Sequence, residues 1–182
     1  RLLCGDCRHP RSWHLLLEGA TADLVWTDPP YNIDYGEVQD RRNDLKARKT
    51  AGPKTKTQAI LNDAMSSRDY RLLLRDAFKA VYQVTKPGGA IYIAHADMWR
   101  VANELAARRA GWTVRQNIQW VKTAFTLGLQ DYQWEHEPVL YGWKLGGPHY
   151  WQGGYRQSTV IDEAVGKLSK LKKKDLLNVI HD

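Results

Sequence analysis

The chain has 182 residues, which is enough for one domain whose core needs no disulfide or metal to support it. Its hydrophobic content of 43% argues against wholesale disorder, and its apolar runs are too short to cross a bilayer. The formal net charge of +7 suits a polyanionic partner, although a generally basic surface would give the same value. With no secretory signal either, the sequence predicts a cytoplasmic protein without a membrane span.

The first third of the chain alternates short apolar segments with polar or proline stops. Residues 2–4 predict a short strand, residues 12–18 a helix with one apolar face, and residues 22–27 a buried strand. Two prolines end the second strand directly after Asp28, because neither can donate a hydrogen bond to a neighbouring strand. Residues 34–58 are polar, basic and aperiodic, so we expect a flexible loop that is either functional or disordered.

The remaining elements alternate helices with strands. The spacing of apolar residues predicts helices over residues 68–84 and 98–109, the second with Val101 and Leu105 facing inward, and a lysine-rich amphipathic helix over residues 167–180. Strands are predicted over residues 90–94, 113–122 and 138–143. This alternation favours an α/β fold with a largely parallel sheet, in which the last two strands pair antiparallel because no helix connects them.

Cys4 and Cys7 are the only cysteines and form a CxxC pair, with His9 and His14 nearby. Such a pair can be redox-active or can supply half of a zinc site. The pair follows an apolar segment and the sequence has no second CxxC, so we favour a structural role and predict no metal site. His95, which follows a predicted strand, is also interpreted as structural rather than catalytic.

The four residues Asp28-Pro29-Pro30-Tyr31, here called the DPPY motif, stand at the carboxyl end of a predicted parallel strand, where open α/β sheets bind ligands. They suit a reaction at an aromatic amine, which is a poor nucleophile because its lone pair is delocalised into the ring. The Asp28 carboxylate and the Pro29 carbonyl can accept hydrogen bonds from the two N–H groups of the amine and so localise its lone pair. Tyr31 offers a ring face on which an extruded base can stack. The amine would then attack a sulfonium methyl group directly. The alternative is a proline strand terminator followed by an exposed tyrosine.

The motif resembles the catalytic motif of S-adenosylmethionine-dependent DNA amino-methyltransferases, and the resemblance covers the chain to about Tyr141. Residues 2–7 precede the motif in the family's order, and residues 86–93, 118–122 and 131–138 follow it. The chain is most similar to permuted members of the family, which place the catalytic motif ahead of the cofactor glycine loop and include phage-type adenine enzymes.

This resemblance implies a class I methyltransferase fold and the transfer of a methyl group from S-adenosylmethionine to adenine N6 in double-stranded DNA, with the target base flipped out. The catalytic residues would be Asp28, Pro29, Pro30 and Tyr31, and the cofactor contacts would be Asp6, Cys7 and Asp28. Aspartate at the first motif position goes with adenine in this family. Cytosine N4 remains an alternative target, because its amine meets the same chemistry. A DNA-binding module that lacks the cofactor is the other alternative.

The family's cofactor loop, a glycine-rich turn between a strand and a helix, does not occur in this sequence. We therefore expect a downstream segment or a second chain to complete the cofactor site and the sheet, unless cofactor binding has been lost. The isolated chain would then be inactive. In this interpretation residues 1–166 form a partial catalytic domain, and residues 167–182 form a separate basic helix.

Basic and aromatic residues suggest where DNA would bind. The predicted loop over residues 34–58 would clamp DNA or serve only as a solvated tether, and the residues between the last two strands would meet the flipped base and its phosphates. The candidate DNA contacts are Arg41, Arg42, Lys46, Arg48 and Lys49 in the loop, and Lys122, Phe125, Tyr132 and Trp134 near the last two strands.

Overall fold

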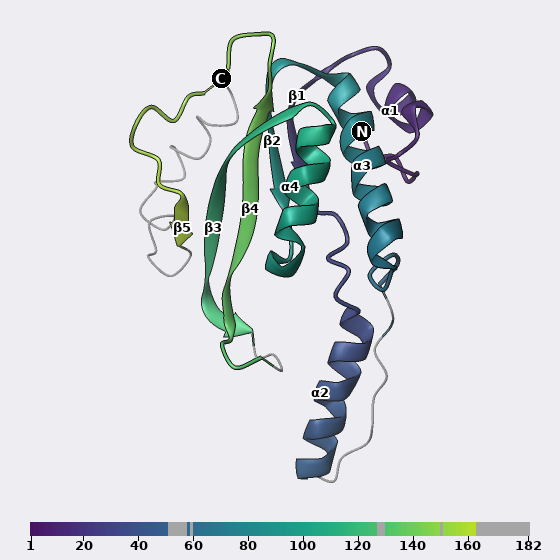
Figure 1. Ribbon diagram of the computed structural model, residues 1–182, viewed down its shortest axis with the longest axis vertical. Coiled ribbons are helices and arrows are strands. Elements are labelled where there is room, and N and C mark those ends of the chain that lie inside the picture. The colour runs from purple at the N-terminus through teal and green to yellow at the C-terminus, as the bar shows by residue number, and fades with distance from the viewer. Residues whose placement is uncertain (51–57, 59, 127–129, 150, 163–182) are drawn as a thin grey trace.

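The computed structural model describes residues 1–50, 58, 60–126, 130–149 and 151–162. It contains one sheet with two long helices packed on it, and a third helix that extends away from the sheet (Figure 1). The helices are α1 (Pro10–Leu17), α2 (Tyr35–Thr50), α3 (Ser67–Val84) and α4 (Arg100–Arg109), with a 3-10 turn η1 (Asp97–Trp99) before α4. The strands are β1 (Ala22–Thr27), β2 (Thr85–Ala94), β3 (Trp112–Thr126), β4 (Trp134–Lys144) and β5 (Val160–Asp162).

The strand order is β1-β2-β4-β3-β5, and β4 runs antiparallel to both of its neighbours while the other four strands run in one direction. β4 is thus inserted between β2 and β3, although it follows β3 in the chain. The predicted mostly parallel sheet, with an antiparallel pair formed by β3 and β4, is confirmed. Because parallel strands end at one edge of a sheet, the residues that follow β1 and β2 lie at the same edge.

α3 carries the apolar face that its sequence predicts. Tyr70, Leu74 and Phe78 of α3 share one core cluster with Ile91 and Ile93 of β2, and none of the five is more than 2% exposed. Burial of side chains this large contributes about 1.5–3 kcal/mol for each residue before the entropy of ordering is counted. The carboxyl end of β2 is therefore held firmly against α3.

α4 packs through small residues instead of the large ones that the sequence suggests. Val101 and Leu105 are 68% and 44% exposed, so the prediction that they face inward is wrong. Ala106 and Ala107 are buried instead, together with Asn103. Alanine lets α4 lie close to α3 and β3, and a spacing of three and four residues does not say which face of a helix is buried.

Residues 2–4 do not form the predicted strand. Leu2 is fully exposed, and no strand of the described residues lies beside this segment. An extended segment needs a neighbour for its backbone hydrogen bonds, and without one its apolar character alone does not make it a strand.

Residues 35–50 form the helix α2 where the sequence predicts a flexible loop. The side chain of Asp34 accepts a hydrogen bond from the Glu37 N–H at 3.3 Å, and its carbonyl accepts one from the Val38 N–H at 3.0 Å. Glu37 also forms an ion pair with Arg41 one turn later. Capping and ion pairs of this spacing favour a helix that has no apolar face, and a search for apolar periodicity does not detect them.

α2 projects beyond the carboxyl ends of β1 and β2, toward the same end of the molecule as the end of β3 and the start of β4 (Figure 1). Within the described residues, it makes no extensive contact with another helix or strand. Residues 51–57 of the predicted loop, and the basic helix predicted over residues 167–182, lie outside the described residues. In the part that is described, no helix is both long and apolar enough to cross a membrane.

Gly142 generates a test of the sheet. It lies on β4 between Ile91 of β2 and Val114 of β3, and a Cβ added to it would lie 2.4 Å from the Thr113 carbonyl oxygen. We expect Gly142→Ala to lower the free energy of unfolding by about 1–3 kcal/mol, because the backbone of β3 would have to move. Urea denaturation measures this loss. The control is Gly5→Ala outside the sheet, and equal losses in both variants would contradict the close approach of β3 and β4.

Candidate functional site

Asp28 directly follows β1 at the carboxyl edge of the sheet, as the sequence predicts. β1 pairs in parallel with β2, with Thr27 opposite Ile93, so Asp28 and the end of β2 share this edge. The strand ends here because Pro29 and Pro30 have no N–H to donate to a neighbouring strand. Asp28 is exposed at this edge, where its carboxylate can reach a ligand.

Asn32 fixes the backbone immediately after the DPPY motif. Its φ of 52° is a left-handed conformation that asparagine tolerates better than most residues. Its side-chain oxygen accepts a hydrogen bond from the Met65 N–H at 2.6 Å, and its carbonyl accepts one from the Trp99 indole at 3.0 Å. The turn after the motif is therefore tied both to the residues before α3 and to η1.

The buried carboxylate of Asp63 holds the next part of the chain. Asp63 is 4% exposed, and its side chain accepts hydrogen bonds from the Tyr35 N–H at 2.7 Å and the Ile33 N–H at 3.4 Å. Its carbonyl accepts a third bond, from the Asp34 N–H at 2.7 Å. A carboxylate needs such donors when it is withdrawn from water. Asp63 thereby sets where α2 begins relative to the motif.

Tyr31 is linked across the sheet edge to β4 and β3. Its hydroxyl donates a hydrogen bond to Glu137 Oε2 at 3.2 Å, although the two residues are 106 positions apart in the chain. The Lys122 ammonium donates to the other oxygen of Glu137. The side chains of Lys122 and Glu137 are 29% and 27% exposed, so this ion pair is partly withdrawn from water. The Lys122 ammonium also lies 5.8 Å from the centre of the Trp120 ring.

Two carboxylates and one cation set the electrostatics around the Tyr31 hydroxyl. Burial raises the pKa of Tyr31 well above its ordinary value, and the charges of Asp28 and Glu137 raise it further. Tyr31 is therefore a permanent hydrogen-bond donor and cannot serve as a base. Desolvation also raises the pKa of Asp28, the nearby Tyr31 hydroxyl opposes this rise, and the negative charge of Glu137 adds to it. Asp28 is thus a stronger proton acceptor than an ordinary carboxylate.

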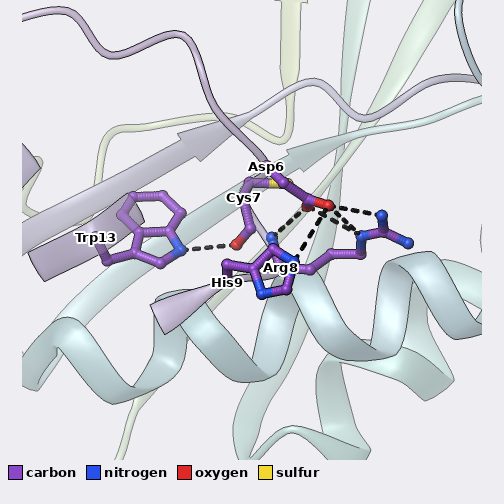
Figure 2. A network of polar contacts seen from close by, with 5 residues as sticks. All are labelled: Asp6, Cys7, Arg8, His9 and Trp13. Atoms are coloured by element: carbon purple, nitrogen blue, oxygen red, sulfur yellow. Dashed lines mark hydrogen bonds and ion pairs between the residues drawn. The ribbon is translucent and has the colours of Figure 1, made fainter. Parts of the chain in front are cut away.

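The carboxylate of Asp6 is engaged by Arg8 (Figure 2). It accepts hydrogen bonds from the Arg8 backbone N–H and Nε, both at 2.9 Å, and from Nη2 at 2.6 Å. These bonds hold the pKa of Asp6 far below its ordinary range. The carbonyl of Cys7 accepts a hydrogen bond from the Trp13 indole at 2.7 Å. Within the described residues, no hydrogen bond or ion pair joins this segment to the DPPY motif.

The cysteine pair is open to solvent. Cys4 and Cys7 are both free and exposed. Partial burial of the Cys7 thiol raises its pKa, which disfavours the reactive thiolate. Among the residues that the structure describes, no group of three His, Cys, Asp or Glu side chains could hold a metal ion.

The predicted DNA contacts of the loop lie on α2. They are Arg41, Arg42, Lys46, Arg48 and Lys49. Arg41 pairs with Glu37, and the Arg42 guanidinium donates to the Gln39 side chain at 3.4 Å. Positions 42, 46 and 49 recur at helical spacing and share one face of the α2 backbone. The structure therefore gathers these positions on one projecting helix.

The other predicted DNA contacts lie on or beside the β3–β4 hairpin. Phe125, Tyr132 and Trp134 are 54%, 92% and 42% exposed near the end of the hairpin, and Lys122 belongs to the network with Tyr31. The Trp134 ring packs edge-on against His136, with 5.7 Å between ring centres. Residues 127–129, which are part of the connection, lie outside the described residues.

Comparison with known proteins identifies the family. A family model for N6/N4 methyltransferases, described as DNA methylase, matches residues 22–179. The chain belongs to this DNA methylase family. No curated protein matches the chain.

Several solved structures share the fold of this chain. M1.HpyAVI aligns with a TM-score of 0.56 and 14% identity, covering 90% of this chain and 65% of that one. The proposed DNA modification methylase TTHA0409 from Thermus thermophilus aligns with a TM-score of 0.52 and 18% identity, covering 87% and 64%. A complex of M1.HpyAVI with SAM aligns with a TM-score of 0.51 and 13% identity, covering 87% of this chain and 64% of that one. These likenesses confirm the open sheet of the class I methyltransferase type, and the chain spans 64% to 65% of the length of these structures.

Sequence patterns alone do not identify every residue that surrounds the DPPY motif. Asn32 follows the motif directly, and its tolerance of a left-handed backbone is a usable signal. Asp63 gives no signal, because its partners are backbone N–H groups. Glu137 falls in a segment that resembles the family, but its contact with Tyr31 depends on the place of β4 beside β2.

His95 follows β2 at the same edge and is fully buried. Its Nδ1 lies 3.1 Å from the Ala96 carbonyl oxygen, and its Nε2 has no hydrogen-bond partner among the described residues. Burial lowers the pKa of His95, and the contact with Ala96 only partly opposes this. As the pH falls, the unfolded chain therefore takes up a proton at His95 before the folded protein does.

We expect the contribution of His95 to stability to be complete above about pH 6.5 and to be lost as the pH falls below that value. His95→Asn should consequently lose less stability than the wild type between pH 7 and pH 5. Denaturant titrations at a series of pH values measure both losses. An equal loss in the variant would assign the acid sensitivity to other groups.

Proposed function

We propose that the chain is the catalytic, target-base part of a DNA methyltransferase that methylates adenine N6. One observation carries the proposal. The Asp28 carboxylate is exposed at the end of β1, beside Tyr31, whose hydroxyl is anchored on Glu137. A polar acceptor next to a fixed aromatic ring is what an extruded base requires of a site that reacts at its amine.

In the proposed reaction the Asp28 carboxylate accepts a hydrogen bond from one N–H of the target amine, and the Pro29 carbonyl accepts a hydrogen bond from the other. The lone pair of the nitrogen is then localised, and the nitrogen forms a bond to a methyl carbon while the bond from that carbon to sulfur breaks. The electron pair of the broken bond stays on sulfur. The surplus proton on nitrogen passes to the Asp28 carboxylate, whose raised pKa favours taking it. Tyr31 stays protonated throughout and holds the base by stacking.

S-adenosylmethionine would supply the methyl group as a positively charged sulfonium. The described residues fit one end of such a cofactor, because Asp28 is exposed whereas the Asp6 carboxylate is bound by Arg8. Cys7 also uses its carbonyl within its own segment. We propose that a further segment of the protein or a second chain completes the cofactor site, and that the isolated chain is inactive.

The edge of the sheet supports this completion. β1 is an edge strand within the described residues, and it exposes Leu24 and Trp26 by 54% and 61%. Trp26 stacks on Tyr92 of β2 with 5.3 Å between ring centres, which continues an apolar surface onto the next strand. An uncovered edge strand with large apolar side chains favours pairing with another segment.

Double-stranded DNA with a flipped base is the proposed partner. The basic positions of α2 and the aromatic residues of the β3–β4 hairpin lie toward the same end of the molecule as the DPPY motif (Figure 1). Lysine and arginine would contact phosphates, which position the duplex, while Phe125, Tyr132 and Trp134 would meet unstacked bases.

Asp28→Asn tests the reaction. The full-length protein should lose methyl transfer by at least about 100-fold, because the amide carries no charge and cannot take the proton. DNA binding should change little. Labelled S-adenosylmethionine measures the rate, and chromatography of the digested DNA distinguishes N6-methyladenine from N4-methylcytosine. The control is Asp23→Asn, at the other end of β1, whose side chain pairs with Lys86.

The outcomes of this experiment separate the possible functions. If the product is N4-methylcytosine, the target is cytosine N4 and not adenine N6. A full-length protein that binds DNA but transfers no methyl group would support a DNA-binding module instead. Near wild-type activity in Asp28→Asn would contradict the role assigned to the carboxylate.

Neutralising the basic positions of α2 tests the DNA contacts. Replacement of Arg41, Arg42, Lys46, Arg48 and Lys49 by glutamine should weaken DNA binding. For each phosphate that the variant no longer contacts, the slope of log affinity against log salt concentration should fall by about 0.9. Fluorescence anisotropy over a salt series measures this slope. Replacement of Arg68 and Arg71 on α3 is the control, and an unchanged slope in the α2 variant would show that α2 does not contact phosphates.

A further inference from the structure

Glu137 has both of its carboxylate oxygens engaged by different elements. Oε2 accepts the Tyr31 hydroxyl at 3.2 Å, and Oε1 accepts the Lys122 ammonium. The Glu137 side chain is 27% exposed, so its charge is only partly solvated by water. A carboxylate in this setting is stable when oppositely charged and donor groups replace the lost water, and Lys122 and Tyr31 do so.

The hydroxyl of Tyr31 is held between two carboxylates. Glu137 accepts its hydrogen bond, and the charge of the Asp28 carboxylate also acts on the hydroxyl and raises its pKa. Two negative groups around one hydroxyl repel each other. The positive charge of Lys122 on the far oxygen of Glu137 offsets that repulsion.

The backbone that follows Tyr31 and the Tyr31 side chain are held by different contacts. Asn32 ties the following turn to Met65 and Trp99, and neither of these hydrogen bonds involves the Tyr31 side chain. A ring that stacks on a base must present its face in one orientation, because misplacement of the base by about 1 Å is enough to slow a reaction severely. The hydrogen bond to Glu137 supplies that restraint.

We propose that Glu137 is a positioning residue: held by Lys122 on one oxygen, it fixes the Tyr31 ring for the target base with the other. This inference rests on the proposed methyl transfer. Glu137 touches neither the amine nor the methyl donor, and it acts through the hydroxyl of Tyr31 and through its charge on Asp28. β4 thereby takes part in the site that β1 begins.

A double-mutant cycle tests the role in the full-length protein. Tyr31→Phe keeps the ring and removes the hydroxyl, and Glu137→Ala removes its acceptor. Each single change should lower kcat by about tenfold, which is the loss expected for one charge-assisted hydrogen bond. Measured at a pH at which Asp28 is fully ionised, so that the effect of Glu137 on the protonation of Asp28 does not enter, the double variant should be no slower than either single variant, because both changes remove the same hydrogen bond. Glu137→Gln, which keeps an acceptor oxygen, should recover part of the rate that Glu137→Ala loses.

The pH profile gives a second measurement that a purely structural residue would not change. Asp28 is faced by Tyr31 from its own loop and by Glu137 from β4, with Lys122 of β3 behind Glu137. Removing the charge in Glu137→Gln should lower the pKa of Asp28. The fall of kcat at low pH that follows from protonation of Asp28, here called the acid limb, should therefore move to lower pH. Glu135→Ala, two residues earlier on β4 and exposed, is the matched control and should leave kcat and the acid limb as they are.

If the double variant loses kcat by the product of the two single losses, the positioning role is overturned. It is also overturned if the acid side of the pH profile of kcat does not shift in Glu137→Gln. Either result leaves the proposed function standing if the wild type methylates DNA and Asp28→Asn does not. A wild type without methyl transfer refutes the proposed function itself. Melting temperatures of all variants identify any rate loss that follows from unfolding.

Discussion

The chain must leave the sheet after Asp28, because Pro29 and Pro30 cannot continue the hydrogen bonding of β1. Where it goes next is fixed by two polar side chains, Asn32 and the buried Asp63, which bind backbone groups on either side of the turn. This constraint has two results. It leaves Asp28 exposed at the carboxyl edge, and it starts α2 in a direction that carries its basic residues beyond the sheet.

The second constraint is the place of β4. An antiparallel strand between β2 and β3 brings Glu137, near the start of β4, to the same edge as the end of β1. Lys122 of β3 and Glu137 of β4 therefore lie beside Tyr31, just after the end of β1. Lys122 offsets one of the two carboxylates that flank the Tyr31 hydroxyl, which leaves the site net negative.

The parts of the fold that were predictable from sequence are those with strong local patterns. α3 has a complete apolar face, β1 ends at two prolines, and the absence of a helix between β3 and β4 predicts their antiparallel pairing. α2 was missed because caps and ion pairs form it, without an apolar face. Residues 2–4 were wrongly assigned to a strand, since apolar character does not supply a neighbouring strand.

The candidate site also has one part that local sequence predicts and another part that it does not. The DPPY motif is local and its position at a strand end follows from its own residues. Glu137 becomes its neighbour only through long-range pairing, which spacing in the sequence does not reveal. The inserted strand also constrains the order of folding, because β3 reaches β2 only through β4. β3 and β4 can form a local hairpin first and then join β2 as one unit, so Lys122 and Glu137 arrive at Tyr31 already paired. Closure of that distant contact is the slow kind of step in folding, and the site is complete only when it has occurred.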